Sequence, residues 1–197
     1  CKLVITTSDN QKYAGTGWLV GPRCVITAGH VVHEGGRRGR WVKKIEVIPA
    51  MRGSLRPYGT LVSRRFYSVN GWIKNGNSAF DYGAIILPSP IGNRLGWFGF
   101  GNYSTQVLRN SQFNTAGFPV DKPYGTMWFM AGRPAAVFPT ELNYYLDTYG
   151  GQSGSCIWRM AQGQRYAVGI HVRGGCPNEG TRITATVYRN ILAWKRL

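Results

Sequence analysis

Ser153 stands in a glycine-rich segment, residues 150–155, which reads GGQSGS. Glycines on both sides allow a substrate to approach closely and allow backbone dihedrals that other residues disfavour. The amides of Gly151 and Ser153 could then point to one spot and stabilise the oxyanion that forms when a serine attacks a carbonyl carbon. Glycine-serine loops are common, so this segment alone also fits an ordinary loop.

A serine nucleophile needs a general base, and the chain has only three histidines. His30 ends the segment VITAGH, which predicts a strand followed by a small-residue turn that presents one imidazole. His33 lies beside Glu34 and the basic loop 35–40, and we expect it to be solvated. No metal is expected at the two histidines, because no third ligand stands out.

The base in turn needs a buried carboxylate to orient it, and the chain has only eight acidic residues. Asp81 is the acidic residue that opens an apolar strand, YGAIIL at residues 82–87. A charge at the edge of a buried strand is costly unless it is paired. Taken alone, Asp81 would fit equally well as a residue that caps a turn.

Three motifs occur in the order His, Asp, Ser: TAGH at 27–30, DYGAI at 81–85 and GQSGS at 151–155. In this order they resemble the trypsin/chymotrypsin superfamily of serine proteases, and more closely its bacterial glutamyl-endopeptidase (V8-like) branch. The resemblance covers nearly the whole chain and continues through GIH at 169–171, Asn178, GTRI at 180–183 and the terminal segment.

The resemblance implies an acyl-enzyme mechanism without a cofactor. His30 would remove the Ser153 proton, Asp81 would orient His30, and the amides of Gly151 and Ser153 would form the oxyanion hole. Trypsin-like zymogens commonly have an aspartate just before the nucleophile, but this chain has Gln152 there. V8-like enzymes also lack that aspartate, so the difference supports the branch and leaves the activation route open.

By the same resemblance, the primary specificity pocket is built before Ser153 and along the strand after His171. His171 and Thr148 match the groups that bind an acidic side chain, so cleavage after Glu or Asp is expected. Strand alternation would place Arg173 on the face of His171, where both could serve an anionic substrate. The expected substrate-binding set is completed by two further strand residues, Val172 and Gly174. A satisfied core histidine is the alternative for His171.

Asp147 argues for a different specificity. It lies six residues before Ser153, where enzymes selective for Lys or Arg carry a pocket aspartate. It could instead pair with His171 or point out of the pocket. Because 24 basic residues would offer many self-cleavage sites, acidic specificity is preferred. An Arg/Lys-specific or narrow regulatory protease, and an inactive two-barrel module that binds anionic partners, remain the alternatives.

The elements that must position these residues are short strands with glycine-rich turns, so the predicted fold class is all-β. Two antiparallel six-stranded barrels of the trypsin-like type are expected, in residues 1–93 with His30 and Asp81, and in residues 94–197 with Ser153. Val187, Ile191 and Trp194 recur at helical spacing and predict an amphipathic C-terminal helix over 185–197. The predicted strands are 2–7, 16–20, 24–27, 41–48, 58–62, 82–87, 112–117, 125–131, 135–138, 142–147, 155–159, 165–172 and 181–184.

The net charge, the apolar runs and the cysteine count indicate the compartment and the partners of the protein. The formal charge of +16 would attract anionic partners or would only aid solubility, and no nucleic-acid-binding motif accompanies it. No apolar run is long enough for a transmembrane helix. Four cysteines without a C-x-x-C pair favour two disulfides in a secreted, monomeric protein whose partner is a polypeptide substrate. The alternative is an intracellular regulatory protease with four free thiols. The four cysteines of the chain are Cys1, Cys24, Cys156 and Cys176.

Overall fold

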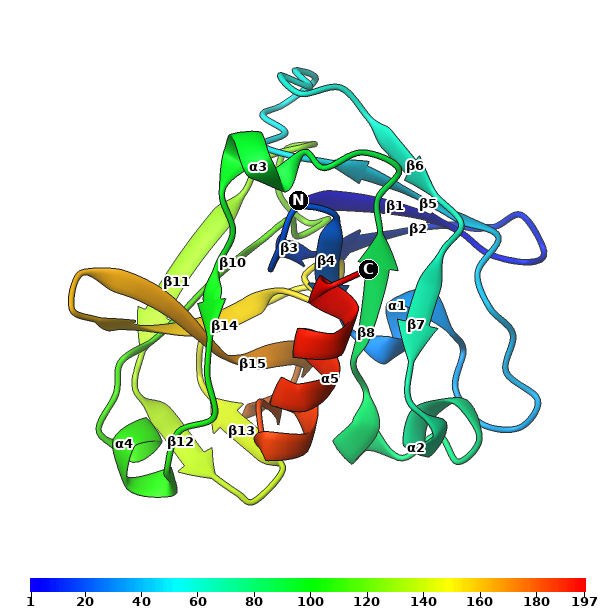
Figure 1. The fold of residues 1–197 in the computed structure, drawn as a ribbon. Helices are drawn as coiled ribbons and strands as arrows, with labels where there is room; N and C mark the ends of the chain where they lie inside the picture. Colours follow the sequence, from blue (N-terminus) through cyan, green and yellow to red (C-terminus); the bar gives the residue numbers. More distant parts are fainter.

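The computed structural model describes all residues 1–197 and consists mainly of short strands (Figure 1). The strands are β1 (Lys2–Thr6), β2 (Lys12–Thr16), β3 (Trp18–Leu19), β4 (Cys24–Thr27), β5 (Lys44–Ile48), β6 (Leu61–Ser63), β7 (Phe66–Ser68), β8 (Gly83–Ile86), β9 (Gly99–Phe100), β10 (Phe113–Gly117), β11 (Trp128–Gly132), β12 (Pro134–Val137), β13 (Glu141–Tyr144), β14 (Cys156–Ala161), β15 (Gln164–Arg173) and β16 (Asn178–Arg182). The helices are α1 (Gly29–Val32), α2 (Asn70–Ile73), the 3-10 turn η1 (Ser78–Phe80), α3 (Gly92–Leu95), α4 (Thr105–Arg109) and α5 (Ala185–Lys195).

The first half of the chain closes into a barrel. Its two antiparallel sheets have the orders β2-β1-β5-β6 and β3-β4-β8-β7. One residue, Gly17, separates β2 from β3, and two residues separate β6 from β7. Each of these pairs is therefore one bent strand shared by both sheets, which makes a closed barrel of six strands. Strands β4 and β8 are buried along their whole length, as their apolar sequences require.

The second half closes in the same way. Its sheet has the order β11-β10-β14-β15-β16-β13-β12, and only Arg133 separates β11 from β12. Counting β11 and β12 as one bent strand gives a second antiparallel barrel of six strands. The short strand β9 adds in parallel to β15 outside this path.

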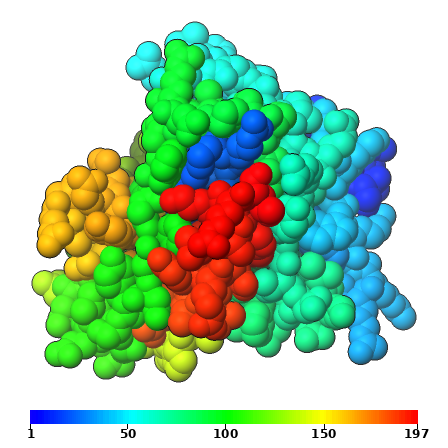
Figure 2. Space-filling view, viewed as in Figure 1, coloured from blue at the N-terminus to red at the C-terminus, as the bar shows by residue number.

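The terminal helix α5 ties the two halves together. Its apolar side chains Val187, Ile191 and Trp194 are buried in a cluster that also holds residues of β4, β8, β14 and β15. The ring of Trp194 lies 5.8 Å from that of Tyr82, beside Asp81 in the chain. In the space-filling view, this C-terminal segment lies between the later part of the first half and the start of the second (Figure 2).

The fold class and the amphipathic C-terminal helix predicted from the sequence are confirmed. The predicted strands did not include β7 and β9 and reached only the last residue of β2, all of them short strands that are not fully buried. The four short helices α1 to α4 were also not expected. The predicted boundary between residues 93 and 94 falls inside α3 and stays a prediction.

Candidate active site

His30 and Asp81 form a tight pair in the first barrel. His30 lies in α1, directly after β4, and Asp81 follows η1 and precedes β8. One carboxylate oxygen of Asp81 accepts the backbone N–H of His30 at 2.8 Å, and the other lies 2.8 Å from His30 Nδ1. Because a carboxylate can only accept, Nδ1 carries the proton and Nε2 is left as the basic nitrogen.

The backbone around this pair is closely packed. A Cβ on Gly29 would lie 2.9 Å from the backbone nitrogen of Tyr82 and 3.0 Å from Asp81 Oδ1, so no other residue fits there without a shift. From the second barrel, the hydroxyl of Thr181 donates to the carbonyl oxygen of Asp81 at 3.1 Å. Asp81 is buried, and these contacts hold its carboxylate beside the imidazole.

The segment around Ser153 lies against the strands that lead to His30. Gly154 has a φ of +88°, and a Cβ there would lie 2.1 Å from Thr27 Oγ1 and 2.2 Å from the carbonyl oxygen of Thr16. The backbone N–H of Thr16 donates to the carbonyl of Ser153 at 2.9 Å. These contacts bring the serine segment of the second barrel to the wall of the first.

The backbone amides of this segment fall into two groups. Those of Gln152, Gly154 and Ser155 donate to carbonyl oxygens of the protein. Those of Gly150, Gly151 and Ser153 donate to none. Two free N–H groups next to a serine hydroxyl are what an oxyanion hole requires.

Ser153 lines a cavity of about 550 Å³ on the second barrel. Its hydroxyl makes no hydrogen bond in the structure, and none joins it to His30. Four of the residues expected to bind substrate also line this cavity, namely Asp147, Thr148, His171 and Gly174. The walls are completed by residues that sequence reasoning did not single out: Met130, Tyr145, Leu146, Tyr149, Gly150, Gly175 and Cys176.

Val172 and Arg173 do not line the cavity. The β-ladder shifts register between His171 and Arg173, so the alternation assumed from the sequence is interrupted there. The guanidinium of Arg173 instead forms an exposed ion pair with Glu179 at 2.8 Å.

His171 is buried in the cavity wall, and its Nδ1 lies 2.6 Å from the hydroxyl of Tyr144. Burial, and secondly the charge of His30, lower the pKa of His171 from 6.5 to about 4. His171 is therefore a neutral imidazole at pH 7. The Tyr144 hydroxyl lies 3.4 Å from the carbonyl of Glu179 and much closer to His171. The hydroxyl has one hydrogen and can donate it to that carbonyl or to Nδ1; donation to Nδ1 leaves Nε2 carrying the imidazole hydrogen.

Thr148 and Asp147 differ in their contacts. The hydroxyl of Thr148 donates to Asn178 Oδ1 at 2.8 Å, and Asn178 also accepts from the backbone N–H of Gly175 at 2.9 Å. Asn178 therefore holds together two sides of the cavity mouth. Asp147 is exposed at the edge of the cavity and makes no ion pair, with His171 or any other residue.

His33 is buried, so the prediction that it would be solvated is wrong. Its Nδ1 accepts the backbone N–H of Gly35 at 2.9 Å, and its ring packs edge-on against Trp41 with centroids 4.9 Å apart. Burial lowers the pKa of His33, which keeps it neutral. It acts as a structural residue that anchors the start of the basic loop.

The prediction of two disulfides is contradicted, because all four cysteines are free. Cys24 in β4 and Cys156 in β14 are buried in the large apolar cluster, where a thiol packs like a small apolar side chain. Burial raises the pKa of Cys24 to about 12. An even count of cysteines was therefore a poor guide to their pairing.

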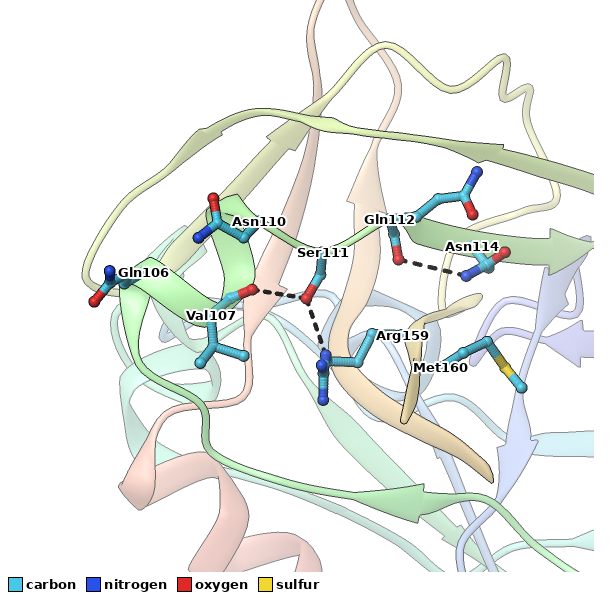
Figure 3. Close-up of a pocket in the computed structure, with 8 residues that line it drawn as sticks. All are labelled: Gln106, Val107, Asn110, Ser111, Gln112, Asn114, Arg159 and Met160. Carbon is cyan, nitrogen blue, oxygen red and sulfur yellow. Dashed lines mark hydrogen bonds between the residues drawn. The ribbon is translucent and has the colours of Figure 1, made fainter. Parts of the chain in front are cut away.

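A second cavity, of about 510 Å³, lies beside α4 (Figure 3). Its serine, Ser111, accepts from Arg159 Nε at 2.9 Å and donates to the carbonyl of Val107 at 2.7 Å. No histidine or carboxylate lines this cavity, so Ser111 has no base there. The cavity around Ser153 is the one that combines a serine, a histidine and free amides. The described residues 1–197 contain no group of three or more His, Cys, Asp or Glu side chains placed to hold a metal ion.

The chain is similar to several curated bacterial proteases. It is 39% identical over 190 residues to a glutamyl endopeptidase of Bacillus licheniformis, covering 91% of this chain and 59% of that protein. It is 39% identical over 189 residues to a protein named extracellular metalloprotease of Bacillus subtilis, covering 95% of this chain and 60% of that one. The chain thus spans about three fifths of the length of these relatives. No family model matches the chain.

Solved structures agree with the fold. A Glu endopeptidase in complex with MPD superposes with a TM-score of 0.86 at 27% identity, covering 100% of this chain and 90% of that one. The protease Anisep from Arthrobacter nicotinovorans superposes with a TM-score of 0.84 at 18% identity, covering 100% and 94%, and supports the fold alone. The chain is thus similar in sequence to bacterial glutamyl endopeptidases over 91% of its length, and it has the fold of a solved Glu endopeptidase.

Proposed function

We propose that this protein is a serine endopeptidase that cleaves polypeptides after glutamate, with Ser153 as nucleophile, His30 as general base and Asp81 as the residue that orients His30. The observation that carries the proposal is a pair of contacts between the Asp81 carboxylate and His30. One oxygen accepts the backbone N–H of His30 and the other lies beside its Nδ1, both at 2.8 Å. These contacts fix the ring and leave Nε2 free to accept a proton.

The chemical steps follow from this arrangement. Ser153 Oγ attacks the scissile carbonyl carbon while His30 Nε2 takes the hydroxyl proton, and the unpaired amides of Gly151 and Ser153 receive the oxyanion. His30 then gives the proton to the leaving amine, and an acyl-enzyme remains on Ser153. Water attacks the acyl group with His30 again as base, and the acid product leaves.

The cavity supports specificity for an acidic side chain. In this proposal the Tyr144 hydroxyl donates to Nδ1 of neutral His171, so that Nε2 carries the hydrogen and donates it. A substrate carboxylate in the cavity would accept this hydrogen, and its charge would favour protonation of the imidazole. Thr148 supplies a second polar group at the mouth. The names of the relatives, glutamyl endopeptidases, agree with this assignment.

We also propose that the protein acts outside the cell, as the name of the Bacillus subtilis relative says of that protein. None of the helices is long and apolar enough to cross a bilayer. The basic surface, +16 in formal charge, would draw acidic substrates toward the cavity.

A peptide library tests the specificity directly. The purified protein is incubated with peptides that differ in the residue before each bond, and the products are read by mass spectrometry. The proposal predicts cuts after Glu, fewer after Asp and none by Ser153→Ala. Cuts mainly after Lys or Arg would instead assign the specificity to Asp147, which lines the same cavity.

A further inference from the structure

An apolar face adjoins the candidate active site and is not used by the mechanism above. It is formed by Val120, Trp128, Met130 and Tyr149, all of them exposed although large and apolar. Met130 and Tyr149 also line the cavity that holds Ser153. Trp128 and Met130 alternate along β11 and therefore project from the same side of the strand. Two of the four residues thus belong to the cavity wall.

Trp128 is held in place although 45% of it is exposed. Its indole N–H donates to Thr126 Oγ1 at 2.8 Å, and the ammonium of Lys122 lies over its ring at 5.0 Å from the centroid. Thr126 in turn donates to the carbonyl of Pro123 at 2.7 Å. A large aromatic side chain that is already ordered loses little entropy on binding, which is typical of residues that dominate an interface.

The position of this face relative to the nucleophile segment indicates which part of a substrate meets it. On one side of the segment, Gly154 N–H donates to the carbonyl of His171 in β15 at 2.8 Å. On the other side, Val120 N–H donates to the carbonyl of Gly150 at 2.8 Å. We expect a substrate that pairs with β15 before the scissile bond to run past Val120 after that bond.

The register of β10 and β11 relates Trp128 to the nucleophile segment. Trp128 is paired with Gly117, and a Cβ on Gly117 would lie 2.9 Å from Gln152 Cγ. Since paired residues of neighbouring strands project to the same side, Trp128 projects to the face of the sheet on which Gly117 meets Gln152 of the nucleophile segment.

We propose that Trp128 and Val120 bind an apolar side chain of the substrate on the carboxyl-terminal side of the scissile bond. Trp128 is then a specificity-determining residue for the leaving peptide, independent of the residue held in the cavity. This inference rests on the proposed endopeptidase function. It predicts that the enzyme selects glutamyl bonds followed by leucine or phenylalanine over those followed by serine.

The experiment compares two kinds of substrate. A glutamyl p-nitroanilide has no residue after the cut, whereas quenched fluorescent peptides carry either Leu or Ser at the two positions after Glu. We expect the wild-type protein to prefer the Leu peptide by about tenfold in kcat/KM, as for one aliphatic side chain in a partly apolar site. Trp128→Ser should remove this preference and leave the p-nitroanilide unchanged, and Trp128→Tyr should restore most of it.

Trp97 provides a matched control. It is 44% exposed, and the ammonium of Lys195 lies 5.2 Å from its ring centroid, so it repeats the surroundings of Trp128 away from the cavity. Trp97→Ser should leave kcat/KM unchanged on the p-nitroanilide and on both peptides. Equal rates on the Leu and Ser peptides in the wild type, or an equal loss on all substrates in Trp128→Ser, would overturn the inference.

The failure of the glutamyl assignment gives a different result. In that case the wild-type protein does not cleave the glutamyl p-nitroanilide. The same comparison is then made with the residue that the peptide library identifies, and the preference after the cut is judged on those substrates.

Discussion

The hydroxyl of Tyr144 lies 2.6 Å from Nδ1 of His171; both side chains are buried, and of the two His171 lines the cavity beside Ser153. This hydrogen bond selects which imidazole nitrogen carries the hydrogen. It therefore decides whether His171 offers a donor or a lone pair to a substrate carboxylate.

Tyr144→Phe should weaken the binding of glutamyl substrates. Without the hydroxyl, Nδ1 loses its partner and the imidazole is free to take the other tautomer. We expect KM to rise about 2- to 10-fold, the value of a neutral hydrogen bond, with a smaller change in kcat. Steady-state kinetics on a glutamyl p-nitroanilide measure both. A fall in kcat at constant KM would show that Tyr144 acts on the chemical step instead.

His171 should make the folded protein less stable in mild acid. Its pKa is about 4 in the folded state and 6.5 in the reference state. Between these values the unfolded chain binds a proton that the folded protein does not, so stability falls as the pH drops from 6.5 to 4. The loss is roughly 3 kcal/mol, at 1.36 kcal/mol per unit.

Denaturant unfolding at pH 7 and pH 4 measures this loss. His171→Phe lacks the titrating group and should lose about 3 kcal/mol less than the wild type over the same interval. His33 and the carboxylates titrate in both proteins and cancel in the comparison. Equal losses in the two proteins would contradict the assignment of this pH dependence to His171.

Asp81→Asn should preserve the structure and remove most of the activity. An amide can donate to Nδ1, which would force the proton to Nε2 and leave His30 unable to act as base. We expect kcat to fall by about 10³- to 10⁴-fold. Stopped assays at high enzyme concentration can detect the low activity that remains. A loss below tenfold would remove Asp81 from the mechanism.

Gly154→Ala should unfold or distort the nucleophile segment. The new Cβ would lie 2.1 Å from Thr27 Oγ1 and 2.2 Å from the carbonyl of Thr16, at a φ of +88°. Gly163→Ala is the matched control, because its φ is +72° and nothing lies within 4 Å of the added Cβ. The control should cost about 1 kcal/mol from backbone strain alone. Gly154→Ala should cost several times more in the same unfolding experiment.

Sequence reasoning reached the fold from local patterns, and it reached the His30–Asp81 pair from the order of three motifs along the chain. Apolar runs such as CVIT and GAII predict buried strands, and the order of the three motifs restricts the family. The Ser153 hydroxyl makes no hydrogen bond with His30 in the structure, so its place in the mechanism stays a prediction.

The remaining features depend on contacts between distant segments. His33 was expected to be solvated because its neighbours are charged, but Trp41 covers its ring. Arg173 was expected beside His171 by alternation, and the register shift between them is not visible in the sequence. The role of Tyr144 could not be predicted either, since it lies 27 residues from His171.

Fluorophosphonate labelling followed by peptide mass spectrometry tests the central claim, that the pair of His30 and Asp81 activates Ser153. The account predicts one adduct per molecule of wild-type protein, located on Ser153, and an adduct formed far more slowly in His30→Ala. An unlabelled wild-type protein, an adduct on another serine, or equal labelling of His30→Ala would contradict it.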